Sequence, residues 1–240
     1  MDIKNISYLL GIAKTTLIDL TTGVDEEERK QALRIQKAIE QNFAVSIQNG
    51  EVSKNDYAAR IFQATNKGLF NGKKKPVPTE ISEHDLQFYE AVQEETNKKE
   101  KELFLFTKGL AQTVKENISD NIKDEDIFME FTNCTKELNQ ESQVTLSLFL
   151  KYYFCQQALE YINQARSLDK SVPLNDLARR MKEDLHKISF IATYDEKEFN
   201  KFRQIIEMPA SLSKARLAKR EAYLQNKLNE TITLLIVSTV

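Results

Sequence analysis

The sequence predicts an all-α fold, an antiparallel bundle of about seven to nine helices with no substantial sheet. Two observations lead to this prediction. The 240 residues include 6 glycines and 4 prolines, and so few turn-forming residues favour long helices over many short strands. Apolar residues also recur at three- and four-residue steps along most of the chain, which is the spacing of one helix face.

The most apolar helical run covers residues 144–168 and is expected to be the central helix. Apolar side chains follow two neighbouring stripes along it, one through Leu148 and Cys155, the other through Phe149 and Tyr153. A helix that is apolar around most of its circumference is typically buried on several sides. Ser142 is the expected cap at its start.

The other helices are predicted from the same periodicity, in chain order. The first is expected to stop at Gly23, the second to open on the acids after Asp25 and to end at Asn49-Gly50. The remaining helices are expected after Ser53, from a capping box of Ser82 and Asp85, at 127–138, after Ser171, from a capping box of Thr193 and Glu196, and after Ser211. The fourth is either one helix with a solvated middle or two helices meeting near residues 96–97. The apolar end at 234–237 is either helix or a short strand, and helix is favoured.

Residues 67–81 form the clearest break in the pattern. They contain Gly68, the pair Asn71-Gly72, Pro76 and Pro78, all of which are typical of irregular chain. The predicted organisation is therefore an N-terminal helical subdomain at 1–66, a loop at 67–81 and a main bundle at 82–240. One continuous domain is the alternative.

Residues 158–169 resemble the second helix of a tetratricopeptide repeat, through Ala158, Ile162 and Ala165. The resemblance implies closely paired helices. It stops at Leu146, which occupies a position where that family has a small residue, and at Lys170, where it has proline. An ordinary helical hairpin is the preferred interpretation.

Catalytic and metal-binding motifs are sparse. The two cysteines, Cys134 and Cys155, form no metal signature and are interpreted as reduced, buried thiols. His84 is interpreted as a solvated residue in the first turn of a helix, and His186 has no Cys or Glu at metal-binding spacing. No cofactor or metal site is expected. If the chain is an enzyme, its site would have to assemble in three dimensions, with Glu83, His84 and Asp85 or the acids at 124–126 as candidates.

Two basic patches are the candidate binding residues. They are Lys73, Lys74 and Lys75 in the loop and Lys214, Arg216, Lys219 and Arg220 on the last helix. Such patches attract phosphate groups and anionic lipid surfaces. Nucleic acid is not the expected partner, because the net charge is −2 and no aromatic side chains are interleaved for base stacking. Peripheral membrane contact through the last helix stays an alternative.

The function that fits best is a helical module that binds another protein through a groove or an exposed apolar face. An enzyme with a non-local acid and histidine site is the second interpretation, and phosphate- or membrane-surface binding is the third. Numerous Asn and Gln residues, with abundant Lys and Ile, are common in proteins from AT-rich bacterial genomes, and a secreted effector or adaptor is one interpretation. A reducing, cytoplasmic compartment is expected from the cysteine usage, and delivery into a host cell stays open. The apolar C-terminal segment is a possible site of homo-oligomer contact.

Overall fold

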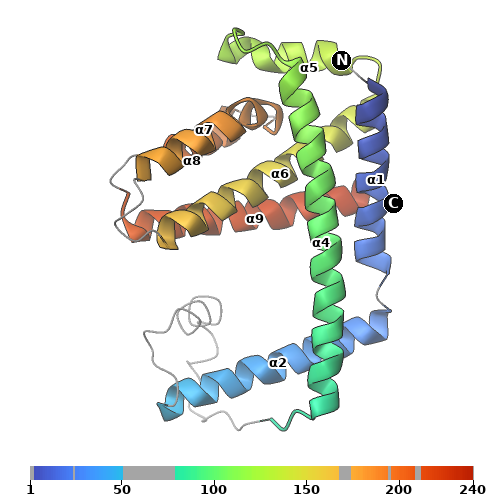
Figure 1. The fold of residues 1–240 in the computed structure, drawn as a ribbon, viewed down its shortest axis with the longest axis vertical. Coiled ribbons are helices and arrows are strands. Elements are labelled where there is room, and N and C mark those ends of the chain that lie inside the picture. Colours follow the sequence, from blue (N-terminus) through green and yellow to red (C-terminus); the bar gives the residue numbers. More distant parts are fainter. Residues whose placement is uncertain are drawn as a thin grey trace. The chain divides into compact units, whose positions relative to one another are not determined.

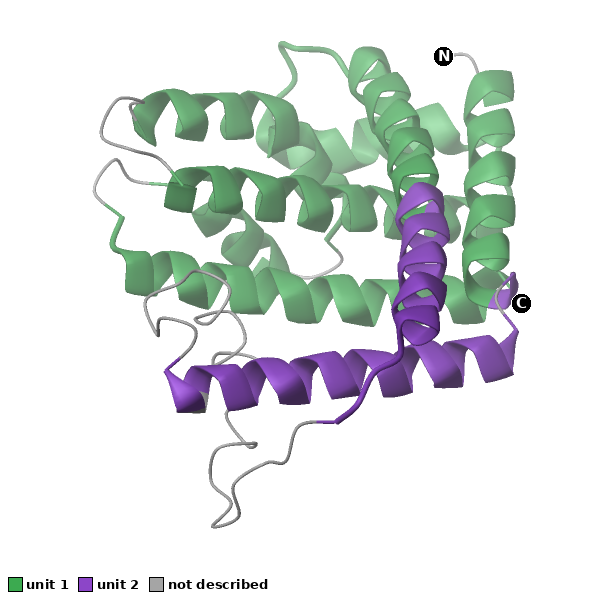
Figure 2. Ribbon diagram, turned by 60° about the horizontal axis from the view of Figure 1, so that its bottom comes forward, with its two compact units in different colours: residues 1–21, 100–240 green, residues 22–99 purple. Residues whose placement is uncertain are grey.

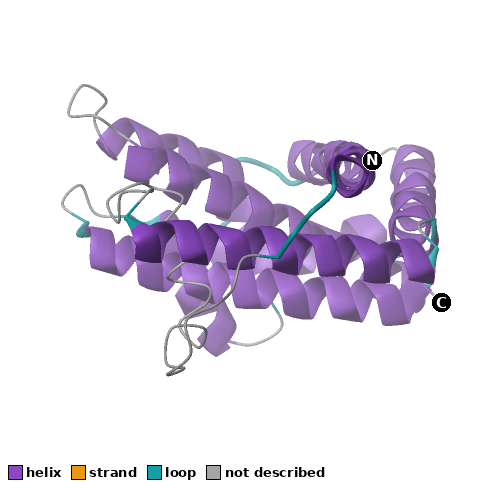
Figure 3. Cartoon of the chain, turned by 90° about the horizontal axis from the view of Figure 1, so that it is seen from below, coloured by secondary structure: helices purple, strands orange, loops and turns teal. Residues whose placement is uncertain are grey.

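The structure is a computed structural model that describes residues 3–23, 25–50, 79–167, 174–193, 196–208 and 212–239. These residues form eight α-helices and one 3-10 helix and contain no strand (Figures 1 and 3). The predicted all-α class is therefore confirmed. The elements are α1 (Ile3–Thr22), α2 (Glu26–Asn49), α4 (Glu83–Asn117), η1 (Asp124–Asp126), α5 (Ile127–Thr135), α6 (Gln140–Ser167), α7 (Leu174–Ile191), α8 (Glu196–Ile206) and α9 (Lys214–Thr239).

The chain divides into two compact units, which are coloured separately in Figure 2. Unit 1 comprises Met1–Thr21 and Glu100–Val240, and unit 2 comprises Thr22–Lys99. The helix predicted after Ser53 and most of the predicted loop at 67–81 lie outside the described residues.

Unit 2 contains α2 and the first half of α4, and both helices have well-defined ends. Three acidic residues occupy the first turn of α2, where the positive end of the helix dipole favours negative charge. Its C-terminal cap is Gly50, with a φ of +79°, a left-handed conformation that glycine adopts without steric cost. At the start of α4, the Asp85 amide donates to Ser82 Oγ at 3.1 Å, and the Ser82 amide donates to Asp85 Oδ2 at 3.3 Å. The predicted capping box is present.

The fourth helix is one continuous helix of 35 residues. None of its residues between Glu83 and Glu102 is buried, whereas five are buried from Leu103 onward. Of the two predicted alternatives, the single helix with a solvated middle is the correct one.

The core of unit 1 is built around α6. Every residue from Thr145 to Cys155 is buried, so the prediction of a central helix surrounded by other helices is confirmed. Helices α7 and α9 pack against α6 along its length, and α8 packs against α7. Aromatic stacking joins these layers: the ring centroids of Phe154 on α6 and Phe202 on α8 are 4.1 Å apart.

Two of the predicted helix caps are wrong. The Ser142 amide donates to Asn139 Oδ1 at 2.8 Å, so Asn139 rather than Ser142 caps α6, three residues earlier than predicted. The Thr193 hydroxyl donates to the carbonyls of Ser189 and Phe190 at the end of α7, and within the described residues it accepts no hydrogen bond from an amide of α8. Ser211 lies outside the described residues, and the Arg216 amide donates to Ser213 Oγ at 3.4 Å.

The apolar C-terminal segment is helical, and α9 continues to Thr239. The favoured interpretation of residues 234–237 is therefore confirmed. Among the described helices, none combines the length and the apolar character that crossing a membrane would need.

Candidate functional site

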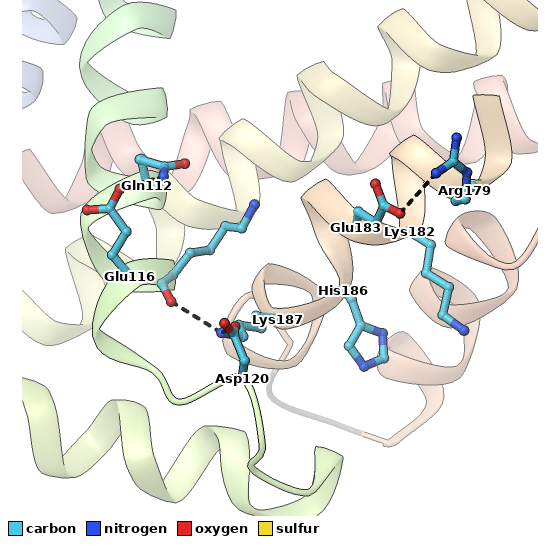
Figure 4. A pocket seen from close by; sticks show the side chains of 9 residues that line it. Gln112, Glu116, Asp120, Arg179, Lys182, Glu183, His186 and Lys187 are labelled. Carbon is cyan, nitrogen blue, oxygen red and sulfur yellow. Dashed lines mark hydrogen bonds and ion pairs between the residues drawn. The ribbon is translucent and has the colours of Figure 1, made fainter. Parts of the chain in front are cut away.

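The candidate site is a cleft between the C-terminal end of α4 and the exposed face of α7, within unit 1. It has a volume of about 500 Å³. Figure 4 shows side chains of α4 on one wall, side chains of α7 on the other, and Asp120 and Lys187 between them. The lining residues are Gln112, Lys115, Glu116, Asp120, Arg179, Lys182, Glu183, His186 and Lys187. We call this the α4–α7 cleft.

The polar wall exists because α7 is strongly amphipathic. Its buried stripe runs through Leu177, Met181, Leu185 and Ile188, at the four- and three-residue steps of one helix face. That packing turns the opposite face, which carries Arg179, Lys182, Glu183 and His186, toward the cleft.

Lys187 anchors the turn that closes the cleft. Its Nζ atom donates to the Ile118 carbonyl at 2.6 Å, to the Lys115 carbonyl at 3.3 Å and to Asp120 Oδ1 at 2.7 Å. Lys187 thereby supplies a donor to two carbonyls at and just beyond the end of α4, where helical partners run out. The hydrogen bond from Lys187 lowers the pKa of the Asp120 carboxyl group. Lys187 and Asp120 are thus structural and neutralise each other.

The other basic side chains of the cleft are weakly engaged. Lys182 is exposed and makes no hydrogen bond or ion pair within the described residues. Lys115 Nζ lies 4.0 Å from Asp184 Oδ1. The Arg179 guanidinium lies 3.7 Å from Asp176 and 3.8 Å from Glu183, longer than strong charge-assisted hydrogen bonds. These three cations are available to a ligand.

His186 joins α7 to η1. Its Nε2 atom lies 2.8 Å from Asp124 Oδ1, and its Nδ1 atom is shielded from solvent without a hydrogen-bond partner. A carboxylate that holds one imidazole nitrogen is the arrangement that orients a general base. Here the second nitrogen does not reach solvent, so the pair serves to fasten η1 onto α7 in this conformation.

The basic residues predicted on the last helix lie on α9, away from the lining of the cleft. Lys214, Arg216 and Lys219 are exposed. Arg220 is half-buried, and its Nη1 atom is shielded from solvent without a hydrogen-bond partner. Burial, together with the charge of Arg216, lowers the pKa of Arg220. The loop lysines, Lys73, Lys74 and Lys75, lie outside the described residues.

The two alternative sets of candidate catalytic residues lie in different units. Glu83 and His84 are exposed in the first turn of α4, and Asp85 is engaged in the capping box. The acids at 124–126 form η1. No group of three or more His, Cys, Asp or Glu side chains within the described residues could hold a metal ion.

Sequence reasoning missed a buried charge cluster where α6, α8 and α9 meet. Lys151 Nζ on α6 donates to Glu198 Oε2 on α8 at 2.7 Å, and each residue is 9% exposed. Lys227 Nζ on α9 lies 3.4 Å from Glu198 Oε1. The only available signal was a lysine within an apolar stripe, which the helical pattern alone does not pair with a partner.

Comparison with known proteins returned no similarity: no protein-family model, curated protein or solved structure matches the chain.

Proposed function

We propose that this chain is a helical interaction module that binds an acidic segment of another protein in the α4–α7 cleft. The observation that carries the proposal is the unpaired Lys182 beside two loosely paired cations, Lys115 and Arg179. Four basic and three acidic side chains line the cleft, and one of the acids, Asp120, is already neutralised by Lys187.

The chemistry of the cleft suits side-chain carboxylates of a partner. On the α4 wall, Glu116 is already engaged, because it accepts a hydrogen bond from Gln112 at 2.6 Å. Exposed ion pairs contribute about 0.2–1 kcal/mol each. Binding through three such cations is therefore expected to be moderate in affinity and sensitive to salt.

The test is fluorescence anisotropy of a labelled peptide rich in Asp and Glu, titrated with the wild-type chain, Lys182→Glu and Lys219→Glu. Lys182→Glu replaces an attraction with a repulsion, and we expect it to weaken binding about fivefold or more, which corresponds to about 1 kcal/mol. Lys219→Glu makes the same charge change on an exposed position of α9 and is expected to leave the affinity unchanged.

Equal loss of peptide affinity in Lys182→Glu and Lys219→Glu would contradict binding in the cleft. It would show that the peptide is attracted by the overall charge of the surface. Weakening by Lys219→Glu alone would move the partner to α9. A peptide in which Lys replaces Asp and Glu serves as the negative control.

The cellular compartment of this protein is part of the same proposal. Cys134 and Cys155 are both free thiols, which supports a reducing compartment. We place the protein in the cytoplasm, either of the cell that makes it or of a host cell into which a bacterial effector or adaptor is delivered.

A further inference from the structure

We propose a second binding site in unit 1, between α8 and α9, in which Tyr223, Lys201 and Lys197 bind the phosphate group of a phosphate monoester. The site is independent of the α4–α7 cleft. A depression of about 530 Å³ lies there, and its lining residues are Glu196, Lys197, Glu198, Lys201, Tyr223 and Lys227.

The Tyr223 hydroxyl is a donor without an acceptor. Its Oη atom is shielded from solvent and has no hydrogen-bond partner within the described residues. Burial raises the pKa of Tyr223 to about 12, so the hydroxyl keeps its proton at neutral pH. A buried polar group without a partner is destabilising, and a ligand oxygen would supply the missing acceptor.

The position of this hydroxyl is fixed by packing. The Tyr223 ring meets the Phe202 ring edge to face, with centroids 6.4 Å apart, and Phe202 is stacked on Phe154 in the core. On its outer side, Lys201 Nζ lies 5.2 Å from the centre of the Tyr223 ring. Lys201 is exposed, and a lysine stem moves freely, so its ammonium group can turn from the ring toward a ligand oxygen beside the hydroxyl.

The charges around the depression favour an anion. Glu198 is already held by Lys151 and Lys227, and Lys227 also donates to Glu230 at 2.6 Å. Lys197 and Lys201 have no ion pair within the described part of the chain. Two free ammonium groups therefore stand beside one exposed carboxylate, that of Glu196.

The flank of α9 extends this positive region. Arg216 and Arg220 precede Tyr223 by seven and three residues, which places all three on one side of the helix. The Nη1 atom of Arg220 is, like Tyr223 Oη, shielded and without a partner. A phosphate group fits such a site better than a single carboxylate, because its several oxygens can accept hydrogen bonds from a hydroxyl and two cations at once.

The test is a residue-resolved NMR titration of the ¹⁵N-labelled full chain with inorganic phosphate at constant ionic strength. We expect saturable shifts of the Lys201 and Tyr223 amides. Tyr223→Phe keeps the ring and removes the hydroxyl, and it is expected to weaken binding about tenfold, the effect of losing a hydrogen bond to a charged group. Lys201→Gln should weaken it as well.

The matched control is Lys214→Gln, which removes a charge from the same helix. Lys214 precedes Tyr223 by nine residues, about two and a half turns, and so lies on the opposite side of α9. Its substitution is expected to leave the affinity unchanged. Equal weakening by Lys214→Gln would overturn the proposal. So would the absence of saturable shifts in this titration together with the absence of capture by phosphatidic acid vesicles.

A second assay separates a lipid headgroup from a soluble phosphate compound. Flotation is measured with phosphatidylcholine vesicles with and without phosphatidic acid. Capture that requires phosphatidic acid and is lost in Tyr223→Phe assigns the phosphate to a lipid. Saturable amide shifts with inorganic phosphate, without capture by the vesicles, assign the bound phosphate group to a soluble compound. If Tyr223→Phe is captured by phosphatidic acid vesicles as well as the wild type is, the proposed site between α8 and α9 is contradicted.

Folding of the variant is checked by its unfolding midpoint without ligand. Tyr223→Phe is expected to match or exceed the wild type, because it removes an unpaired hydroxyl. Tyr161→Phe is the contrasting variant: the Tyr161 hydroxyl donates to Asp184, so its loss is expected to lower the midpoint.

Discussion

At the scale of single residues, the most consequential feature is the ion pair of Lys151 and Glu198 inside the helical core. Both side chains are almost fully buried, and their groups are 2.7 Å apart. Moving two charges out of water costs free energy that their attraction only partly returns. The pair therefore adds little net stability, but each member depends strongly on the other.

We expect Glu198→Leu to lower the free energy of unfolding by about 3–5 kcal/mol, because it leaves the buried Lys151 ammonium group without its partner. Lys151→Met should lower it by less, because Lys227 Nζ still lies 3.4 Å from Glu198 Oε1. The double variant should fall within about 1 kcal/mol of the wild type or exceed it. Urea denaturation of the four proteins measures this cycle. Additive losses in the double variant would show that the two side chains are not coupled.

Ion pairs between residues far apart in the chain could not be predicted from the sequence. Helical spacing places Lys151 on a stripe of the central helix, but its partner lies 47 residues away. His186 and Asp124 are 62 residues apart, and neither belongs to a local motif. Contacts of this kind depend on how helices pack, so the α4–α7 cleft and the α8–α9 site could not be predicted from periodicity.

At the scale of elements, local chemistry predicted most helices and some of their ends. The capping box at Ser82 and the stop at Gly50 were predicted because each requires only neighbouring residues. The start of α6 was not, since Asn139 and Ser142 are both residue types that cap helices. Only the structure shows that the Asn139 side chain accepts the hydrogen bond.

Asn139→Ala is accordingly expected to lower the free energy of unfolding by about 1 kcal/mol, the usual effect of losing an N-cap. Ser142→Ala lies inside the first turn and should change stability by less than about 0.5 kcal/mol. Chemical denaturation of both variants decides between the two caps. A larger loss of unfolding free energy in Ser142→Ala than in Asn139→Ala would show that Ser142 is the cap, as the sequence predicted.

At the scale of the whole molecule, unit 1 is organised around one helix that is buried through eleven consecutive residues, from Thr145 to Cys155. This was visible in the sequence because two adjacent apolar stripes leave no polar face. The division into two units was harder to predict from the sequence. One of its two boundaries falls inside the continuous helix α4, between Lys99 and Glu100, and no glycine or proline lies at that point.

The two thiols should report on this organisation. Burial raises the pKa of Cys155 to about 12, so that it is both shielded and un-ionised, and we expect an alkylating reagent to modify it only when unit 1 unfolds. Cys134 is half-buried and should react faster. Mass spectrometry after timed alkylation in increasing urea measures both rates. Rapid modification of Cys155 in native buffer would contradict a closed core.

The mutual dependence of Lys151 and Glu198 also constrains how this protein can change over evolutionary time. Replacing Glu198 alone by an apolar residue passes through a destabilised intermediate, because Lys151 is left buried without a partner, whereas a simultaneous exchange for two apolar side chains does not. The two positions are therefore expected to vary together among descendants of this sequence, as a charged pair or as an apolar pair. Mixed combinations should be rare, even though the residues lie on different helices.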